Sequence, residues 1–130
     1  MTTKKIKLEK PLTEVELQLM NAVWNLGDCT VKEVQQEISK IRDLAYTSIA
    51  TIMKILEQKS ALKSVKSDKA HIYSALISKS EYESSSLRHL ADGLFQGDPS
   101  SMVMRLLSDS KLSKDELSAI KKLLEKRIES

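Results

Sequence analysis

The chain has 130 residues, of which 41% are hydrophobic and 30% are charged, with only three Gly and two Pro. This balance is typical of one globular domain, or of one domain with an extension, and it excludes a disordered chain. The sequence has no apolar run of about 18 residues, which excludes a transmembrane helix, and no apolar region of a secretory signal follows its basic N-terminus. Its single cysteine, Cys29, cannot form an internal disulfide, so we expect a cytoplasmic protein.

The formal charge of +3 is concentrated in one part of the sequence. Residues 1–43 are balanced, and residues 80–130 carry one net negative charge. Residues 44–79 carry six lysines against Glu57 and Asp68, a balance of +4. Such a concentration favours a polyanionic partner, although a solvated surface has a similar composition.

Residues 1–11 are predicted to form a flexible basic segment, and two helices are expected after it. Residues 13–16 and 30–33 match the capping box Ser/Thr-x-x-Glu, and each box precedes apolar residues at helical spacing. We expect the first helix to end at Leu26 and the second at about Ile41.

A third helix is predicted over residues 46–59, and its two sides differ in chemistry. One narrow stripe is apolar and contains Ile49, Ile52, Met53 and Leu56. The opposite side has no carboxylate and contains Thr47, Thr51, Lys54 and Gln58. Glu57 is expected between the two sides. A merely solvated helix would usually mix Glu with Lys on its outer face, so this pattern indicates a binding surface.

The pattern then changes to short stretches of β-favouring residues. Residues 62–66 and 71–77 are predicted to pair as an antiparallel hairpin with a four-residue connection, and residues 28–30 to add a short third strand. Three helices followed by a hairpin is the order of a winged helix-turn-helix. The predicted fold class is therefore mainly α with a small antiparallel β-hairpin, with a winged-helix DNA-binding domain over residues 12–78.

Residues 79–130 are predicted to form a helical dimerisation domain of three amphipathic helices. Ser78 with Glu81 and Ser113 with Glu116 match further capping boxes, and residues 97–99 break the pattern between helices. About 50 residues of helix form a small core, so self-association would bury the apolar faces, although folding back onto the first domain is the alternative. The expected dimerisation residues are Leu87, Leu90, Leu94, Phe95, Met102, Val103, Leu106, Leu107, Leu117, Ile120 and Leu124.

Catalytic and metal-binding patterns are weak throughout the sequence. Neither His71 nor His89 lies in a nucleophile motif, and we find no phosphate loop or paired-cysteine ligand set, so we expect neither an enzyme nor a metal or other cofactor. Cys29, Trp24 and Tyr82 are expected to be packing residues.

DNA binding is the function that the third helix and the hairpin favour. The major groove of B-DNA admits one helix, whose early residues reach base edges while lysines contact phosphates. A solvated polar side chain is the alternative for each residue alone, but a shared face favours binding. The candidate DNA-binding residues are Tyr46, Thr47, Ser48, Thr51, Lys54, Lys63, Lys66, Lys69 and His71.

The sequence resembles the penicillinase and methicillin-resistance repressors of the BlaI/MecI type, which have copper-responsive relatives. The resemblance extends from Leu12 to about Ile128, and its clearest parts are residues 12–16, 23–24, 45–51, 56–59, 71–74 and 77–82. It implies a winged-helix homodimer that represses resistance or metal-handling genes from a palindromic operator. It also implies that residues 46–51 begin the recognition helix, that Lys66 and Lys69 lie in the wing, and that the helices after Ser78 dimerise.

In the antibiotic-responsive branch, the resemblance implies a membrane sensor that triggers cleavage of the C-terminal region, without direct binding of the repressor to membranes. The family's cleavage dipeptide is not recognisable within residues 97–101, and the Cys-x-Cys copper ligands are missing from the C-terminus. Ser60 stands where a Gly is usual, Ile55 where a basic residue is expected, and Ala75 where Pro is common.

Two other functions remain open from the sequence. A small ligand bound near Trp24, or between the fourth helix and the wing, could control half-site spacing. The winged helix could also be a protein-interaction module without DNA binding. The operator sequence, the target genes and the inducing signal are not encoded in these patterns.

Overall fold

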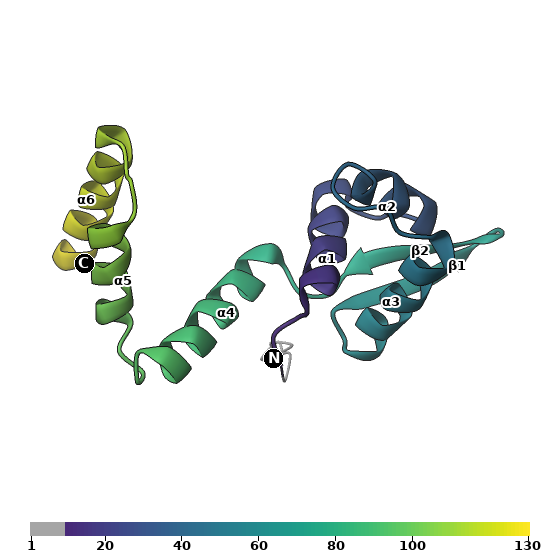
Figure 1. Cartoon of the computed structure of the whole chain (residues 1–130), viewed down its shortest axis with the longest axis horizontal. Coiled ribbons are helices and arrows are strands. Elements are labelled where there is room, and N and C mark those ends of the chain that lie inside the picture. The colour runs from purple at the N-terminus through teal and green to yellow at the C-terminus, as the bar shows by residue number, and fades with distance from the viewer. Residues whose placement is uncertain (1–9) are drawn as a thin grey trace. The chain divides into compact units, whose positions relative to one another are not determined.

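A computed structural model describes residues 10–130 and contains helices and one hairpin (Figure 1). The expected flexible segment 1–11 therefore falls outside the described residues, except for its last two. Within the described part, the elements in chain order are α1 Glu14–Leu26, α2 Val31–Ile38, α3 Tyr46–Gln58, β1 Leu62–Ser67, β2 Ala70–Ala75, α4 Lys79–Leu94, α5 Pro99–Asp109 and α6 Lys114–Glu129. This arrangement confirms the predicted fold class, a mainly α winged helix.

The predicted capping boxes begin their helices through local hydrogen bonds. In α1, the Thr13 side chain accepts from the backbone N–H of Glu16, and the Glu16 carboxylate accepts from the backbone N–H of Thr13. The boxes that begin α2 and α6 are closed in the same way, and Ser78 with Glu81 makes the same pair of bonds before α4. These starts were predictable because each depends on residues three positions apart.

Helix α2 ends at Ile38, earlier than the expected end near Ile41. The backbone N–H groups of Ile41 and Arg42 both donate to the carbonyl of Ile38, which closes the helix in a turn. The Ile41 side chain is 67% exposed, so it does not extend the buried apolar face of α2. An apolar residue at the right spacing was therefore insufficient to predict the end of this helix.

The hairpin has a two-residue turn instead of the four-residue connection that was expected. Ser67 pairs with Ala70 at its tip, which leaves Asp68 and Lys69 to form the turn. Asp68 has a φ of 53°, in the left-handed region that Asp tolerates better than most residues. The expected third strand is present as a single bridge, in which Cys29 and Tyr73 exchange backbone hydrogen bonds of 3.0 and 2.7 Å.

The core of the winged helix lies among α1, α2, α3 and the base of the hairpin. Helix α1 contacts α2, α3 and β2, and α3 contacts β1. Fully buried side chains from every one of these elements fill the interior: Leu19, Met20, Val34, Ile38, Ile49, Met53, Leu56, Leu62 and Tyr73. Only one side of α3 therefore packs into the core.

Cys29 is buried at the edge of this core, as expected for a packing residue. Burial, together with the nearby carboxylates of Glu33 and Asp28, raises the pKa of its thiol to about 11. The thiol is therefore protonated at neutral pH and is a poor nucleophile.

The described chain divides into two compact units, the first ending at Leu87 and the second spanning Arg88–Ser130. Within the second unit, α5 and α6 run in opposite directions and are joined by a short loop (Figure 1). The domain boundary expected after Ser78 stays a prediction, because compact packing does not test independent folding. None of the described helices is long and apolar enough to cross a membrane.

Candidate nucleic-acid interface

Helix α3 presents one polar side to solvent, as its sequence pattern predicted. Ile49, Met53 and Leu56 on its inner side are fully buried, whereas Ile52 is only half-buried. All five candidate DNA-binding residues of this helix are exposed: Tyr46, Thr47, Ser48, Thr51 and Lys54. The side of α3 that the core leaves uncovered is thus the side expected to enter a groove.

The N-terminus of α3 leaves its first amides without a side-chain cap. Ala45 occupies the N-cap position and provides no acceptor, unlike the N-cap residues of α1, α2 and α6. The unsatisfied N–H groups and the helix dipole make this end favourable for a phosphate group. The same end carries Thr47 and Ser48, whose short side chains allow close approach to DNA.

Two acidic groups near the C-terminal end of α3 are both engaged in side-chain contacts. Glu57 accepts a 2.6 Å hydrogen bond from the Ser64 hydroxyl, which joins α3 to the first strand of the hairpin. The second group, the carboxylate of Glu16 on α1, lies 2.7 Å from the Lys59 Nζ and is itself buried. The exposed residues of α3 include no carboxylate, which favours contact with the phosphate groups of DNA.

The hairpin places its candidate residues on two different faces. Lys66 pairs directly with His71, and both share a face with the buried residues Leu62 and Tyr73. Lys63 pairs with Ser74 on the opposite face. Lys66, His71 and the turn residue Lys69 thus lie together at the exposed tip, whereas the alternation of side chains along β1 separates Lys63 from Lys66.

These features match a family of known regulators. The family model described as Penicillinase repressor matches residues 12–126, most of the chain. The chain belongs to the penicillinase repressor family. As a member, it is a DNA-binding transcriptional repressor and not an enzyme.

Individual relatives agree with this membership. The penicillinase repressor of Bacillus licheniformis is 26% identical over 114 residues, 88% of this chain and 89% of the relative. The methicillin resistance regulatory protein MecI of Staphylococcus aureus is 22% identical over 116 residues, 89% of this chain and 94% of the relative. A solution structure of monomeric B. licheniformis BlaI with the blaP half-operator is 28% identical, with a TM-score of 0.50, and it covers 58% of this chain and 92% of the BlaI chain.

The turn that ends α3 has a left-handed backbone conformation at Ser60. Ser60 has a φ of 65°, the left-handed conformation for which Gly is usual. Its N–H donates to the Glu57 carbonyl, and the Ala61 N–H donates to the Leu56 carbonyl. These two bonds form a Schellman motif, whose left-handed position is usually Gly, so α3 ends on an unfavourable residue.

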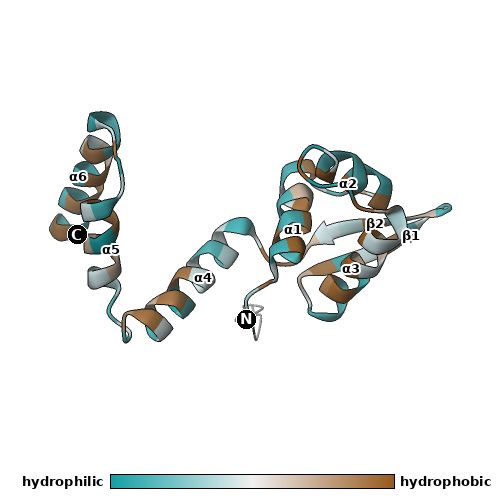
Figure 2. Cartoon of the chain, viewed as in Figure 1, coloured by the Kyte–Doolittle hydropathy of each residue, from teal (hydrophilic) through white to brown (hydrophobic). Residues whose placement is uncertain are grey.

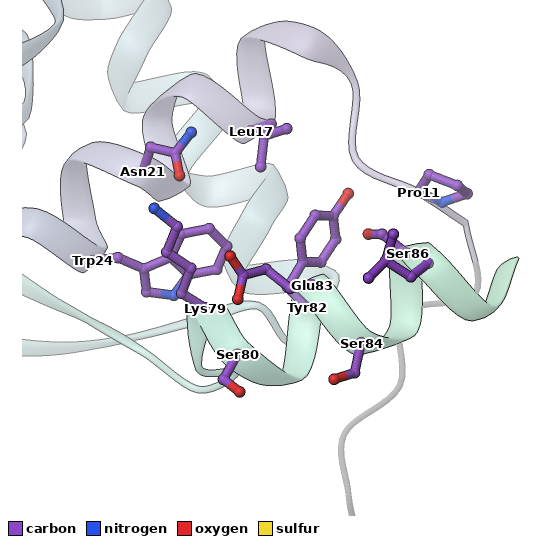
Figure 3. Close-up of a pocket in the computed structure, with 11 residues that line it drawn as sticks. Pro11, Leu17, Asn21, Trp24, Lys79, Ser80, Tyr82, Glu83, Ser84 and Ser86 are labelled. Carbon is purple, nitrogen blue, oxygen red and sulfur yellow. The ribbon is translucent and has the colours of Figure 1, made fainter. Parts of the chain in front are cut away.

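A pocket lies between α1 and the beginning of α4, within the first compact unit (Figure 3). The Trp24 and Tyr82 rings are 5.9 Å apart, and the Trp24 Nε1 donates to the Ile77 carbonyl at 2.9 Å. Asn21 and Lys79 add polar groups to a mainly apolar lining, around a volume of about 910 Å³. The aromatic residues are packing residues as expected, and the pocket is of a size that ligands occupy.

The candidate dimerisation residues fall into two groups by their exposure in the single chain, and the ribbons of α5 and α6 show several brown, hydrophobic positions (Figure 2). Met102 is buried, and Phe95, Leu107 and Ile120 are partly buried. The others expose between 44% and 66% of their surface: Leu87, Leu90, Leu94, Val103, Leu106, Leu117 and Leu124.

Three groups that affect this interface were not among the sequence-predicted sites. Ile55 and Gln58 are both exposed on α3. Gln58 was expected on the polar side but was not among the candidate DNA-binding residues, and helical spacing from Thr51 was a signal that could have included Ile55. Glu16, which joins α1 to α3 through Lys59, was predicted only as part of a capping box. Its contact spans 43 residues of sequence, and no local pattern indicates it.

Proposed function

We propose that this repressor acts as a cytoplasmic homodimer on a palindromic operator that controls resistance or stress genes. The observation that supports this most directly is the exposed side of α3, whose exposed residues include no carboxylate, together with the exposed lysines Lys66 and Lys69 of the hairpin. In each subunit, α3 would enter the major groove while Lys66 and Lys69 contact phosphates. A bound dimer would block access of the polymerase to the promoter.

Dimerisation is supported by the apolar residues that the second unit leaves exposed. Leu106, Leu117 and Leu124 are each about half exposed, which is costly for a unit of this size in water. A second copy of the same surface would cover them with twofold symmetry, the commonest arrangement among oligomers. The half-sites would then lie about one or more helical turns apart, roughly 34 Å per turn.

Release would follow from weakening the dimer. Two linked half-sites bind far more tightly than one, so a modest change in the C-terminal unit would detach the repressor. By analogy with the family, the signal would come from a membrane sensor that acts through proteolysis of that unit. Control by a small ligand is the second candidate, and the pocket beside Trp24 is the observation that favours it.

The test is a salt titration of DNA affinity with matched lysine variants. Wild-type affinity should fall with salt at a slope of about −0.9 per phosphate contact. Lys66→Ala should flatten that slope by about one unit and leave sequence preference unchanged, whereas Lys126→Ala on α6 should leave both unchanged. Salt-independent binding, or no binding to any duplex, would instead identify a protein-interaction module.

A further inference from the structure

One exposed residue on α3 does not fit a surface that only contacts phosphates and polar base edges. Ile55 is 38% exposed, although its neighbours Leu56 and Met53 are completely buried. At 100° per residue, Ile55 follows Thr51 by one turn and precedes Gln58 by one turn, and all three are exposed. Ile55 therefore lies within the side of α3 that faces away from the core.

Thr51 adds a second apolar group to the same place. Its hydroxyl donates a 2.9 Å hydrogen bond to the Thr47 carbonyl, one turn earlier in the helix. The proton of this hydroxyl is thus committed to the backbone, and the methyl group remains as the free part of an exposed side chain. Thr51 and Ile55, four residues apart, form a small apolar strip on an otherwise polar side.

The major groove contains one apolar group that such a strip can contact, the C5-methyl group of a pyrimidine, which in unmodified DNA belongs to thymine. A charged or amide side chain would read a hydrogen-bonding edge, and Ile55 has no such atoms. We propose that Ile55, supported by the Thr51 methyl group, determines operator specificity by contacting a thymine methyl group. This inference rests on the proposed entry of α3 into the major groove.

The experiment removes the methyl group from the DNA and the side chain from the protein. Duplexes that the full chain binds preferentially are first selected from a random library. Each thymine of a half-site is then replaced in turn by uracil, which differs from thymine only in lacking the C5-methyl group. At one position the wild type should bind about fourfold more weakly to the uracil duplex, the effect of removing one buried methyl-sized group. Ile55→Ala should bind the thymine and uracil duplexes equally.

The matched control is Leu26→Ala on α1, because Leu26 has nearly the same exposure, 39%, and lies outside α3. This variant should keep the fourfold discrimination. Ile55→Lys should lose it and steepen the salt slope by about one unit through a new phosphate contact.

The outcomes separate this inference from the proposed function. If Ile55→Ala still discriminates thymine from uracil, or if no replacement weakens the wild type, the methyl-contact role is wrong while sequence-specific, salt-dependent binding still supports the repressor. If no duplex is selected, both proposals fail together.

Discussion

At the scale of single residues, the most informative position is Ser60, where the backbone conformation favours Gly but the residue is Ser. The Schellman motif at the end of α3 needs a left-handed residue, and Ser60 adopts it at a φ of 65°. A Cβ atom in this conformation approaches the backbone carbonyl, which costs roughly 1 kcal/mol relative to Gly. This chain therefore retains a small strain at the point where α3 leads into the hairpin.

Ser60→Gly should raise the free energy of unfolding by about 0.5–1 kcal/mol, because the substitution relieves this strain. Urea denaturation followed by circular dichroism measures the change. Ser39→Gly is the control, since Ser39 ends α2 with a right-handed φ of −59°, where Gly gives no relief and should destabilise. Equal effects of the two substitutions would show that left-handed strain is not the cause.

At the scale of elements, the contact between Glu16 and Lys59 ties the beginning of α1 to the end of α3. Burial alone would raise the pKa of Glu16, but hydrogen bonds from Lys59 and from Thr13 together hold it below its ordinary value. The ionised carboxylate thus favours the folded state. Because this carboxylate is 8% exposed and Lys59 is 43% exposed, the pair is partly protected from solvent.

The sign of the resulting pH effect follows from the lowered pKa. The stabilisation by Glu16 is present above the pKa of the unfolded chain and is lost as the pH falls through the lower folded-state pKa. At pH 7, Glu16→Gln should cost about 1–2 kcal/mol, less than a fully buried charged hydrogen bond because Lys59 is partly exposed.

Urea midpoints measured between about pH 6 and pH 3 would check this dependence. The wild type should lose stability more steeply than Glu16→Gln. Glu116→Gln serves as the control, because Glu116 closes the same kind of capping box on α6 but is fully exposed and forms no ion pair with a lysine among residues 10–130. Parallel curves for the wild type and Glu16→Gln would contradict the assigned role.

Elements were predictable from the sequence where short-range chemistry defines them. The capping boxes before α1, α2 and α6 could each be predicted from two residues of the sequence. The inner apolar stripe of α3 could be predicted from the helical spacing of its residues. The end of α2 and the length of the hairpin turn depended on backbone hydrogen bonds that no side-chain pattern records. That Lys63 and Lys66 lie on opposite faces was predictable, because side chains alternate along a strand and these residues are three positions apart.

For the candidate interface, the sequence indicated the correct side of α3 but not all of its members. Tyr46 to Lys54 were recognised because their polar character suits a groove, whereas Ile55 was noticed only as a departure from the family. Helical spacing from Thr51 would have placed Ile55 on the same side, where it is 38% exposed, but its apolar side chain did not suit a list chosen for polar character.

At the scale of the whole molecule, the exposed leucines of the second unit predict assembly. Leu124→Asp should place a charge in the proposed dimer surface and yield monomers in sedimentation velocity, with operator affinity lowered at least tenfold through loss of the second half-site. Ser118→Asp introduces the same charge on another side of α6 and should remain dimeric. A fully dimeric Leu124→Asp would mean that a different surface mediates assembly.

The buried bridge between Cys29 and Tyr73 has a consequence for the kinds of signal this repressor can receive. Oxidants and electrophiles that act on regulators usually attack a thiolate, and a thiol with a pKa of about 11 inside the core offers almost none. Modification of Cys29 would first require residues 28–30 to separate from the second strand of the wing. Thiol-reactive compounds should therefore leave Cys29 unmodified unless the fold itself has begun to open.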